Sequence, residues 1–150
     1  AAQSFHWIDT GRGLAEARRV LAPGGHFTAL WNHRDHHRSE ILGETMEALR
    51  RMVPEYEHGY RARPWGEIIC STGEFRDVVS HQLPHMVPMT RARYLDLWRS
   101  NNRICTAAGD RMQAFLDEVG RLFDRRGVST VDVPYVCRAW TAVASHGRSS

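Results

Sequence analysis

The sequence predicts an α/β fold built on a doubly wound sheet, and three observations near its start support this prediction. Residues 1–7, AAQSFHW, have the character of a strand that reaches its carboxyl end, and a helical segment follows them. A Gly-rich turn and a second strand complete the order within residues 16–32, EARRVLAPGGHFTALWN. Open sheets of this class bind ligands at the carboxyl ends of their strands. We therefore expect residues 1–7 to lie at a binding site.

The first predicted helix covers residues 11–21, because its apolar residues share one face. Asp9 or Thr10 can cap its first turn. The sequence Ala-Pro-Gly-Gly at residues 22–25 ends it, since proline cannot continue a helix and glycine accepts a left-handed exit. The short apolar run at residues 26–31 is typical of a strand that is covered on both faces.

A polar break is expected at residues 32–38, followed by a helix over residues 39–53. The helix carries one apolar stripe: Leu42, Met46, Leu49 and Val53. Residues 54–73 look irregular and hold several aromatic residues. A long irregular segment in a compact domain is often a lid or a pocket wall.

The rest of the chain is expected to form a strand, two helices and a final strand. A strand is expected over residues 75–86, where Pro84 indicates an edge position or a bulge. A short helix over residues 91–100 follows, with Thr90 as its cap.

The most regular periodicity predicts a helix over residues 110–124 that stops at Gly127. Residues 131–143, rich in Val, Tyr, Trp and Thr, predict a late strand, and residues 145–150 a frayed tail. No linker or repeat appears, so all 150 residues are expected to belong to one domain, with no second domain.

The composition disfavours several classes of protein. All 20 basic residues are Arg, and they are spread along the chain among 17 acidic residues, so no nucleic-acid interface is predicted. No apolar run approaches the roughly 20 residues that cross a bilayer. No signal peptide is visible, and a soluble, cytoplasmic protein without membrane contact is expected. Cys70, Cys105 and Cys137 lie far apart and predict buried free thiols.

Several motifs resemble the class I S-adenosylmethionine-dependent methyltransferases, in particular a small-molecule, type 11-like branch. They are A-Q-S-F-H-W-I-D from residue 2, A-E-A-R-R-V-L-A-P-G-G from residue 15, and the strand end L-W-N. The later segments M-T-R-A-R-Y-L-D-L-W-R-S and V-D-V-P-Y-V-C-R-A-W resemble the C-terminal portion of that branch. The resemblance implies a Rossmann-like sheet, S-adenosylmethionine as cofactor, and an enzyme that methylates a small organic acceptor: a carboxylate, a hydroxyl or a natural-product scaffold.

The chain departs from the family pattern at its start. Family members begin with a strand, a G-x-G turn and an acidic residue that holds the ribose hydroxyls. Here the one G-x-G is Gly11-Arg12-Gly13, which opens a helix with no strand directly before it. The chain is thus expected to be the C-terminal half of one methyltransferase domain, with the fourth to seventh strands. A missing N-terminal half or a partner chain would then carry the Gly-rich cofactor loop, making the enzyme a heteromer in the second case.

The resemblance also implies roles for residues near the chain's start. Ala2, Gln3 and Ser4 would lie beside the cofactor, with His6 and Trp7 flanking the reacting centre. Because imidazole titrates near neutral pH, His6 is the candidate catalytic base. It could instead form a hydrogen bond with the cofactor or with a neighbouring loop.

Trp31 and Asn32 leave the next strand at the same edge and would bind the acceptor. Tyr60, together with Tyr56 and Trp65, could form an aromatic wall or belong to the core. The run His-Arg-Asp-His-His at residues 33–37 is expected to be a polar loop and to bind no metal, since adjacent histidines do not readily converge on one ion.

Two other functions remain open at this level. The chain could be a methyltransferase-like, non-catalytic subunit that binds and stabilises a partner, or, through its His-rich run, a metal-dependent enzyme. Some methyltransferase folds use the cofactor only as a cationic scaffold for cyclisation, which this half does not decide.

Overall fold

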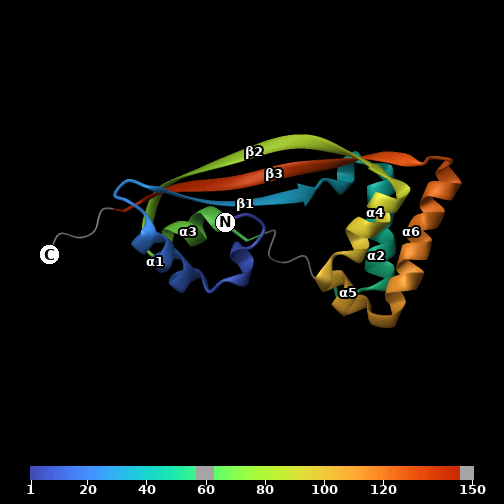
Figure 1. Ribbon diagram of the computed structural model, residues 1–150, viewed down its shortest axis with the longest axis horizontal. Helices are drawn as coiled ribbons and strands as arrows, with labels where there is room; N and C mark the ends of the chain where they lie inside the picture. Colours follow the sequence, from blue (N-terminus) through green and yellow to red (C-terminus); the bar gives the residue numbers. More distant parts are fainter. Residues whose placement is uncertain (57–62, 146–150) are drawn as a thin grey trace. The chain divides into compact units, whose positions relative to one another are not determined.

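A computed structural model describes residues 1–56 and 63–145 (Figure 1). The elements in chain order are η1 (Phe5–Trp7), α1 (Thr10–Val20), β1 (His26–Arg34), η2 (His36–Arg38), α2 (Glu40–Met52), α3 (Trp65–Cys70), β2 (Phe75–Thr90), α4 (Arg91–Arg99), α5 (Asn102–Ala108), η4 (Gly109–Arg111), α6 (Met112–Arg126) and β3 (Thr130–Ala144).

The chain folds into two compact units. Unit 1 comprises Ala1–His33, Gly59–Pro84 and Val136–Ser150, and unit 2 comprises Arg34–His58 and His85–Tyr135. Strands β2 and β3 contribute residues to both. Each unit has its own hydrophobic core.

The sheet has three strands in the order β1-β3-β2. The Ala144 N–H donates to the Gly25 carbonyl at the start of β1 (2.8 Å), and the Asp35 N–H after β1 donates to the Pro134 carbonyl early in β3 (2.9 Å). Strand β3 is therefore antiparallel to β1. On the other edge of β1, Ala2 forms a parallel bridge with Leu30. In the described part of the chain, parallel pairing is limited to that bridge.

Strand β2 pairs with the other side of β3. The Ser145 N–H donates to the Glu74 carbonyl before β2, and the Arg91 N–H after β2 donates to the Ser129 carbonyl, both at 2.9 Å. These contacts make β2 antiparallel to β3 and leave its outer side as an edge of the sheet. The edge position indicated by Pro84 is confirmed, and the strand runs past the expected residue 86 to Thr90.

Unit 1 packs helices α1 and α3 on one face of the sheet (Figure 1). Its buried core combines aromatic and small residues: Phe5, Leu14, Ala29, Trp31, Trp65, Ile69, Phe75, Ala142 and Ala144. Gly13 lies where α1 approaches the segment before it, because a Cβ there would come within 2.7 Å of the Ile8 side chain. The second glycine of the G-x-G at residues 11–13 therefore has a packing reason.

Unit 2 gathers α2, α4, α5 and α6 around a separate core. Tyr94 and Trp98 of α4 are fully buried there, and the Tyr94 hydroxyl donates to Thr45 Oγ1 at 3.0 Å. Thr45 in turn donates to the Ile41 carbonyl at 2.7 Å. Burial raises the pKa of Tyr94 from its ordinary 10.0 to about 12, against the smaller opposing effect of the hydrogen bond to Thr45.

The predicted helix ends are confirmed where local chemistry sets them. Asp9 accepts from the Arg12 N–H (2.8 Å), and Thr90 caps α4. Ser39 caps α2, which was not predicted from the sequence. Gly127 ends α6 in the left-handed conformation with φ 61°.

Three expectations are corrected, and one helix was not predicted. Residues 32–34 continue β1 instead of breaking it, because the strand keeps its place beside β3. The segment 54–73 contains α3, whose Trp65 and Ile69 point into the core of unit 1. Helix α5, capped by Asn101, was not anticipated. The cysteines are free, but Cys70 is exposed and the other two are half-buried.

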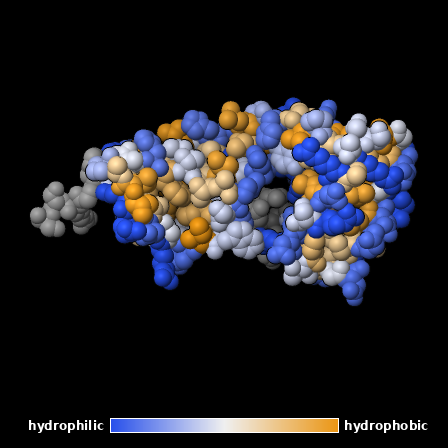
Figure 2. All heavy atoms as spheres, viewed as in Figure 1, coloured by the Kyte–Doolittle hydropathy of each residue, from blue (hydrophilic) through white to orange (hydrophobic). Residues whose placement is uncertain are grey.

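In the described ranges, none of the helices combines the length and the apolar character needed to cross a bilayer. Hydrophobic residues reach the visible surface of both units among hydrophilic ones (Figure 2).

Replacing Asp9 by Ala is expected to lower the free energy of unfolding by about 1 kcal/mol, because the Arg12 N–H loses its acceptor. Asp9→Asn keeps a side-chain oxygen and serves as the control. Urea denaturation of both variants measures the difference. An Asp9→Ala midpoint equal to that of wild type would contradict the capping role.

Folding stability is expected to fall as the pH rises from about 10 to about 12. An unfolded tyrosine ionises at its ordinary pKa of 10.0, whereas the pKa of folded Tyr94 is about 12, so the folded state holds its proton longer. A spectrophotometric titration should show one late-ionising phenol that is absent in Tyr94→Phe. A late step that persists in Tyr94→Phe would assign the shift to another tyrosine.

Candidate functional site

The chain's first residues are held against β1 and then leave the sheet. The Leu30 N–H donates to the Ala1 carbonyl (3.0 Å), and the Gln3 N–H donates to the Leu30 carbonyl (2.9 Å). Gln3 has a φ of 55°, which is uncommon for a residue with a side chain. This left-handed residue turns the backbone out of the sheet directly before η1.

The short helix η1 is anchored by Phe5. The Ser4 carbonyl accepts from the Trp7 N–H at 2.9 Å and closes the turn. The Phe5 ring is buried and meets the Phe27 ring edge-on at 5.2 Å and the Trp65 ring at 5.7 Å. With Phe5 fixed inside the core, the two residues after it have limited freedom.

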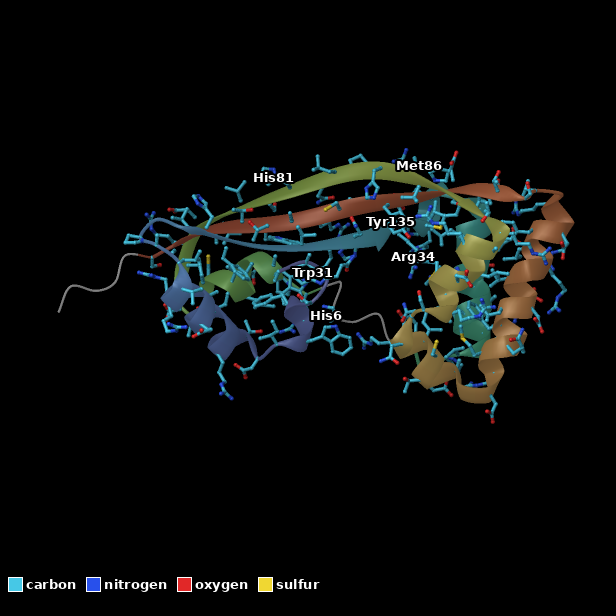
Figure 3. All side chains as sticks on the ribbon, in the orientation of Figure 1. His6, Trp31, Arg34, His81, Met86 and Tyr135 are labelled. Carbon is cyan, nitrogen blue, oxygen red and sulfur yellow. The ribbon has the colours of Figure 1, made fainter. Side chains whose placement is uncertain are left out.

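His6 lies between a buried and an exposed tryptophan. The Trp31 indole N–H donates to His6 Nδ1 at 3.1 Å, and the His6 and Trp7 rings are 4.8 Å apart. Trp31 is 1% exposed, whereas Trp7 is 65% exposed. Figure 3 shows His6 and Trp31 together beneath the sheet of unit 1.

Trp31 is the centre of an aromatic cluster. Its ring stacks on Trp65 at 4.6 Å with an interplanar angle of 23° and meets Trp140 edge-on at 5.6 Å. These contacts come from β1, α3 and β3, so three elements fix one side chain.

Of the other predicted site residues, three lie in or beside unit 1's first strand and turn. Ala2 lies in the parallel bridge, and Ser4 precedes η1 without a side-chain cap bond. Asn32 is exposed, and its backbone carbonyl accepts from Gln3 Nε2 at the long distance of 3.5 Å. Tyr60 lies outside the described residues.

Unit 1 thus brings together Gln3, His6, Trp31 and Asn32, while the Trp31 ring itself faces the core. The sequence left two roles open for Trp65, an aromatic wall of the pocket or the core, and the structure places it in the core of unit 1. Tyr56 packs on the core of unit 2.

The His-rich run after Asn32 has its own structure. His36 and His37 belong to η2, with their rings 4.1 Å apart. The Arg34 guanidinium lies over the Trp98 ring, 4.3 Å from its centroid. Within residues 1–56 and 63–145, no group of three or more His, Cys, Asp or Glu side chains is placed to hold a metal ion.

Unit 1 has a surface depression of about 430 Å³ that the sequence did not predict. It lies beside the Trp31 cluster and is lined by Gly66, Glu67, Cys70, Val78, Ser80 and Trp140. The residues come from α3, β2 and β3, which are far apart in sequence, so no local pattern could have joined them.

Comparison with known proteins supports one class, the methyltransferases. No model of a protein family matches the chain. Over 121 residues, it is 31% identical to an uncharacterized methyltransferase of Mycobacterium bovis and equally to two of Mycobacterium tuberculosis. The match covers 81% of this chain and 46% of each relative, so the chain spans about half the length of the curated relatives it matches.

A solved structure is similar over nearly the whole chain. It is that of a proposed type II methyltransferase from Anaeromyxobacter dehalogenans, with a TM-score of 0.59, 23% identity, and coverage of 96% of this chain and 62% of that chain. At this identity, the likeness concerns the fold alone. The chain is therefore a homologue of proteins named methyltransferases and shares a methyltransferase fold, as its motifs indicated.

Replacing Phe5 by Ala is expected to lower the free energy of unfolding by about 3 to 5 kcal/mol, because a buried aromatic anchor is lost. Trp7→Ala, in the same turn but exposed, is the matched control and should change stability by less than about 0.5 kcal/mol. Chemical denaturation compares the two. Equal losses would mean that Phe5 does not anchor η1.

Proposed function

We propose that the chain supplies the later part of an S-adenosylmethionine-dependent methyltransferase acting on a small organic acceptor: a carboxylate, a hydroxyl or a natural-product scaffold. The observation that carries this proposal is the path of residues 1–7. Ala2 forms a parallel bridge with Leu30 of β1, and the backbone turns out of the sheet at Gln3, so that His6 reaches Trp31 in the carboxyl half of that strand. Ligands bind at such strand ends in open α/β sheets.

The residues present fit a cationic nucleoside. The exposed Trp7 ring offers an aromatic face, which attracts a sulfonium as it attracts other cations. Gln3 offers both an amide donor and an acceptor, and Ala2 and Ser4 are small enough for close approach. We assign these four residues to the cofactor side, and Asn32 to the acceptor side.

The chemistry asked of the protein is mainly alignment. S-adenosylmethionine supplies a methyl group on a sulfonium, which is already a good leaving group. The protein must hold the acceptor in line and exclude water. Trp31 and the buried core beneath His6 give that side of the site a fixed wall. Tyr60 remains a proposed acceptor contact from the resemblance alone.

A front half completes the site in this proposal, supplied by an upstream segment or by a partner chain. The relatives extend well beyond the matched region, which is 46% of their length. Among the described residues of unit 1, only Ala2 forms a bridge on the outer edge of β1, and Trp7, Ile8 and Val20 expose apolar surface. A front half that continues the sheet at that edge would carry the Gly-rich loop and the ribose-binding acid.

Calorimetric titration with S-adenosylmethionine tests the proposal, using the chain joined to the front half of the Mycobacterium tuberculosis relative. Binding is expected in the joined protein. Trp7→Ala should weaken it by about fivefold, the equivalent of about 1 kcal/mol for a cation over an exposed ring. Trp7→Phe should restore most of the affinity, and Val79→Ala, exposed on strand β2 away from this edge, is the apolar control. No binding by the joined protein would favour a non-catalytic subunit.

A further inference from the structure

We propose that Trp31 is a positioning residue that fixes His6 as the neutral tautomer protonated at Nε2, so that His6 serves as a hydrogen-bond donor and not as a general base. The inference rests on the proposed function for its role in methyl transfer, whereas the tautomer itself is a property of the chain alone.

The first step concerns the Trp31 N–H. An indole nitrogen is a donor only, and at 1% exposure Trp31 has little access to water. A buried donor without a partner costs about 1 to 3 kcal/mol. His6 Nδ1, at 3.1 Å, is the acceptor that removes this cost.

The second step concerns what holds Trp31 and His6 in place. The Trp31 ring is stacked on Trp65 and abutted by Trp140. On the other side, His6 follows the buried Phe5 in a closed turn. The Trp31 ring and the backbone that carries His6 are therefore positioned independently of the hydrogen bond.

The third step follows from imidazole chemistry. A neutral imidazole carries one protonated and one unprotonated nitrogen. Because Nδ1 accepts from Trp31, the proton must lie on Nε2. A general base needs an unprotonated nitrogen directed at its substrate, and here that nitrogen is directed at a buried indole.

A donor at Nε2 can hold an oxygen of the bound molecule without any proton transfer. This role suits an acceptor that already lacks a proton on its attacking atom. Of the acceptor classes proposed above, a carboxylate meets this condition at neutral pH, since its ordinary pKa is near 4. A hydroxyl acceptor would need a base other than His6.

The tautomer can be observed directly. In the ¹⁵N-labelled chain, two-bond proton–nitrogen correlation spectra report which nitrogen of each histidine carries the proton. His6 is expected to show the Nε2-protonated form throughout, with exposed His81 as an internal reference. A His6 pattern protonated at Nδ1, or an equal mixture of tautomers, would overturn the proposal.

Two tryptophan variants separate the hydrogen bond from aromatic packing. Trp31→Phe keeps a ring in the cluster but removes the donor, and His6 should become a mixture of tautomers. Trp140→Phe removes an indole that touches the same cluster without a bond to His6, and should leave the His6 pattern unchanged. An unchanged pattern in Trp31→Phe contradicts the inference. If that variant does not fold, the wild-type spectrum still shows which nitrogen of His6 carries the proton.

Turnover by the joined protein tests the functional part. A glutamine at residue 6 retains both a donor and an acceptor, so His6→Gln should lower kcat by about fivefold or less, as for one weakened hydrogen bond. Loss of a general base would lower it by about 100-fold or more. That larger loss would reject the donor role. Absence of any methyl transfer by the wild-type protein would instead reject the proposed function and leave the tautomer result intact.

Discussion

The structure of unit 1 depends on the buried indole of Trp31, which contacts side chains from three other elements. Trp31 stacks on a tryptophan from α3, meets another from β3, and donates its N–H to a histidine from η1. A large flat side chain in this position links elements that are distant in sequence. Because close-packed cores tolerate little change in shape, the site residues at the chain's start take their places from this cluster.

Unit 2 has a hydrogen-bonded group of buried polar atoms of its own. Tyr94, Thr45 and the Ile41 carbonyl form a short hydrogen-bonded series within α2 and α4, and Arg34 covers the Trp98 ring from the end of β1. A buried hydroxyl with a partner adds specificity to the packing of helices, since an alternative arrangement would leave it unpaired. The helical unit therefore has its own determinants, independent of those that order His6.

The sequence predicted most accurately what depends on neighbouring residues. The caps Asp9 and Thr90 and the stop at Gly127 are chemical features of a few consecutive positions. The later end of β1 and helix α3 depend on packing partners elsewhere in the chain and were missed. The motifs placed Gln3, His6 and Asn32 near one another, but not the bond from Trp31 to His6, because it spans 25 positions and two elements. Periodicity carries no information about such a pair.

The free edge of β2 has a consequence for the behaviour of the protein in solution. A strand of 16 residues at the border of a sheet offers unpaired backbone groups to any other extended chain. Pro84 and Pro88 interrupt that row, since proline has no N–H to donate. The same strand exposes Val79 and Leu83, which would otherwise favour stacking of molecules edge to edge. The two prolines thus protect an apolar border against fibrous self-association.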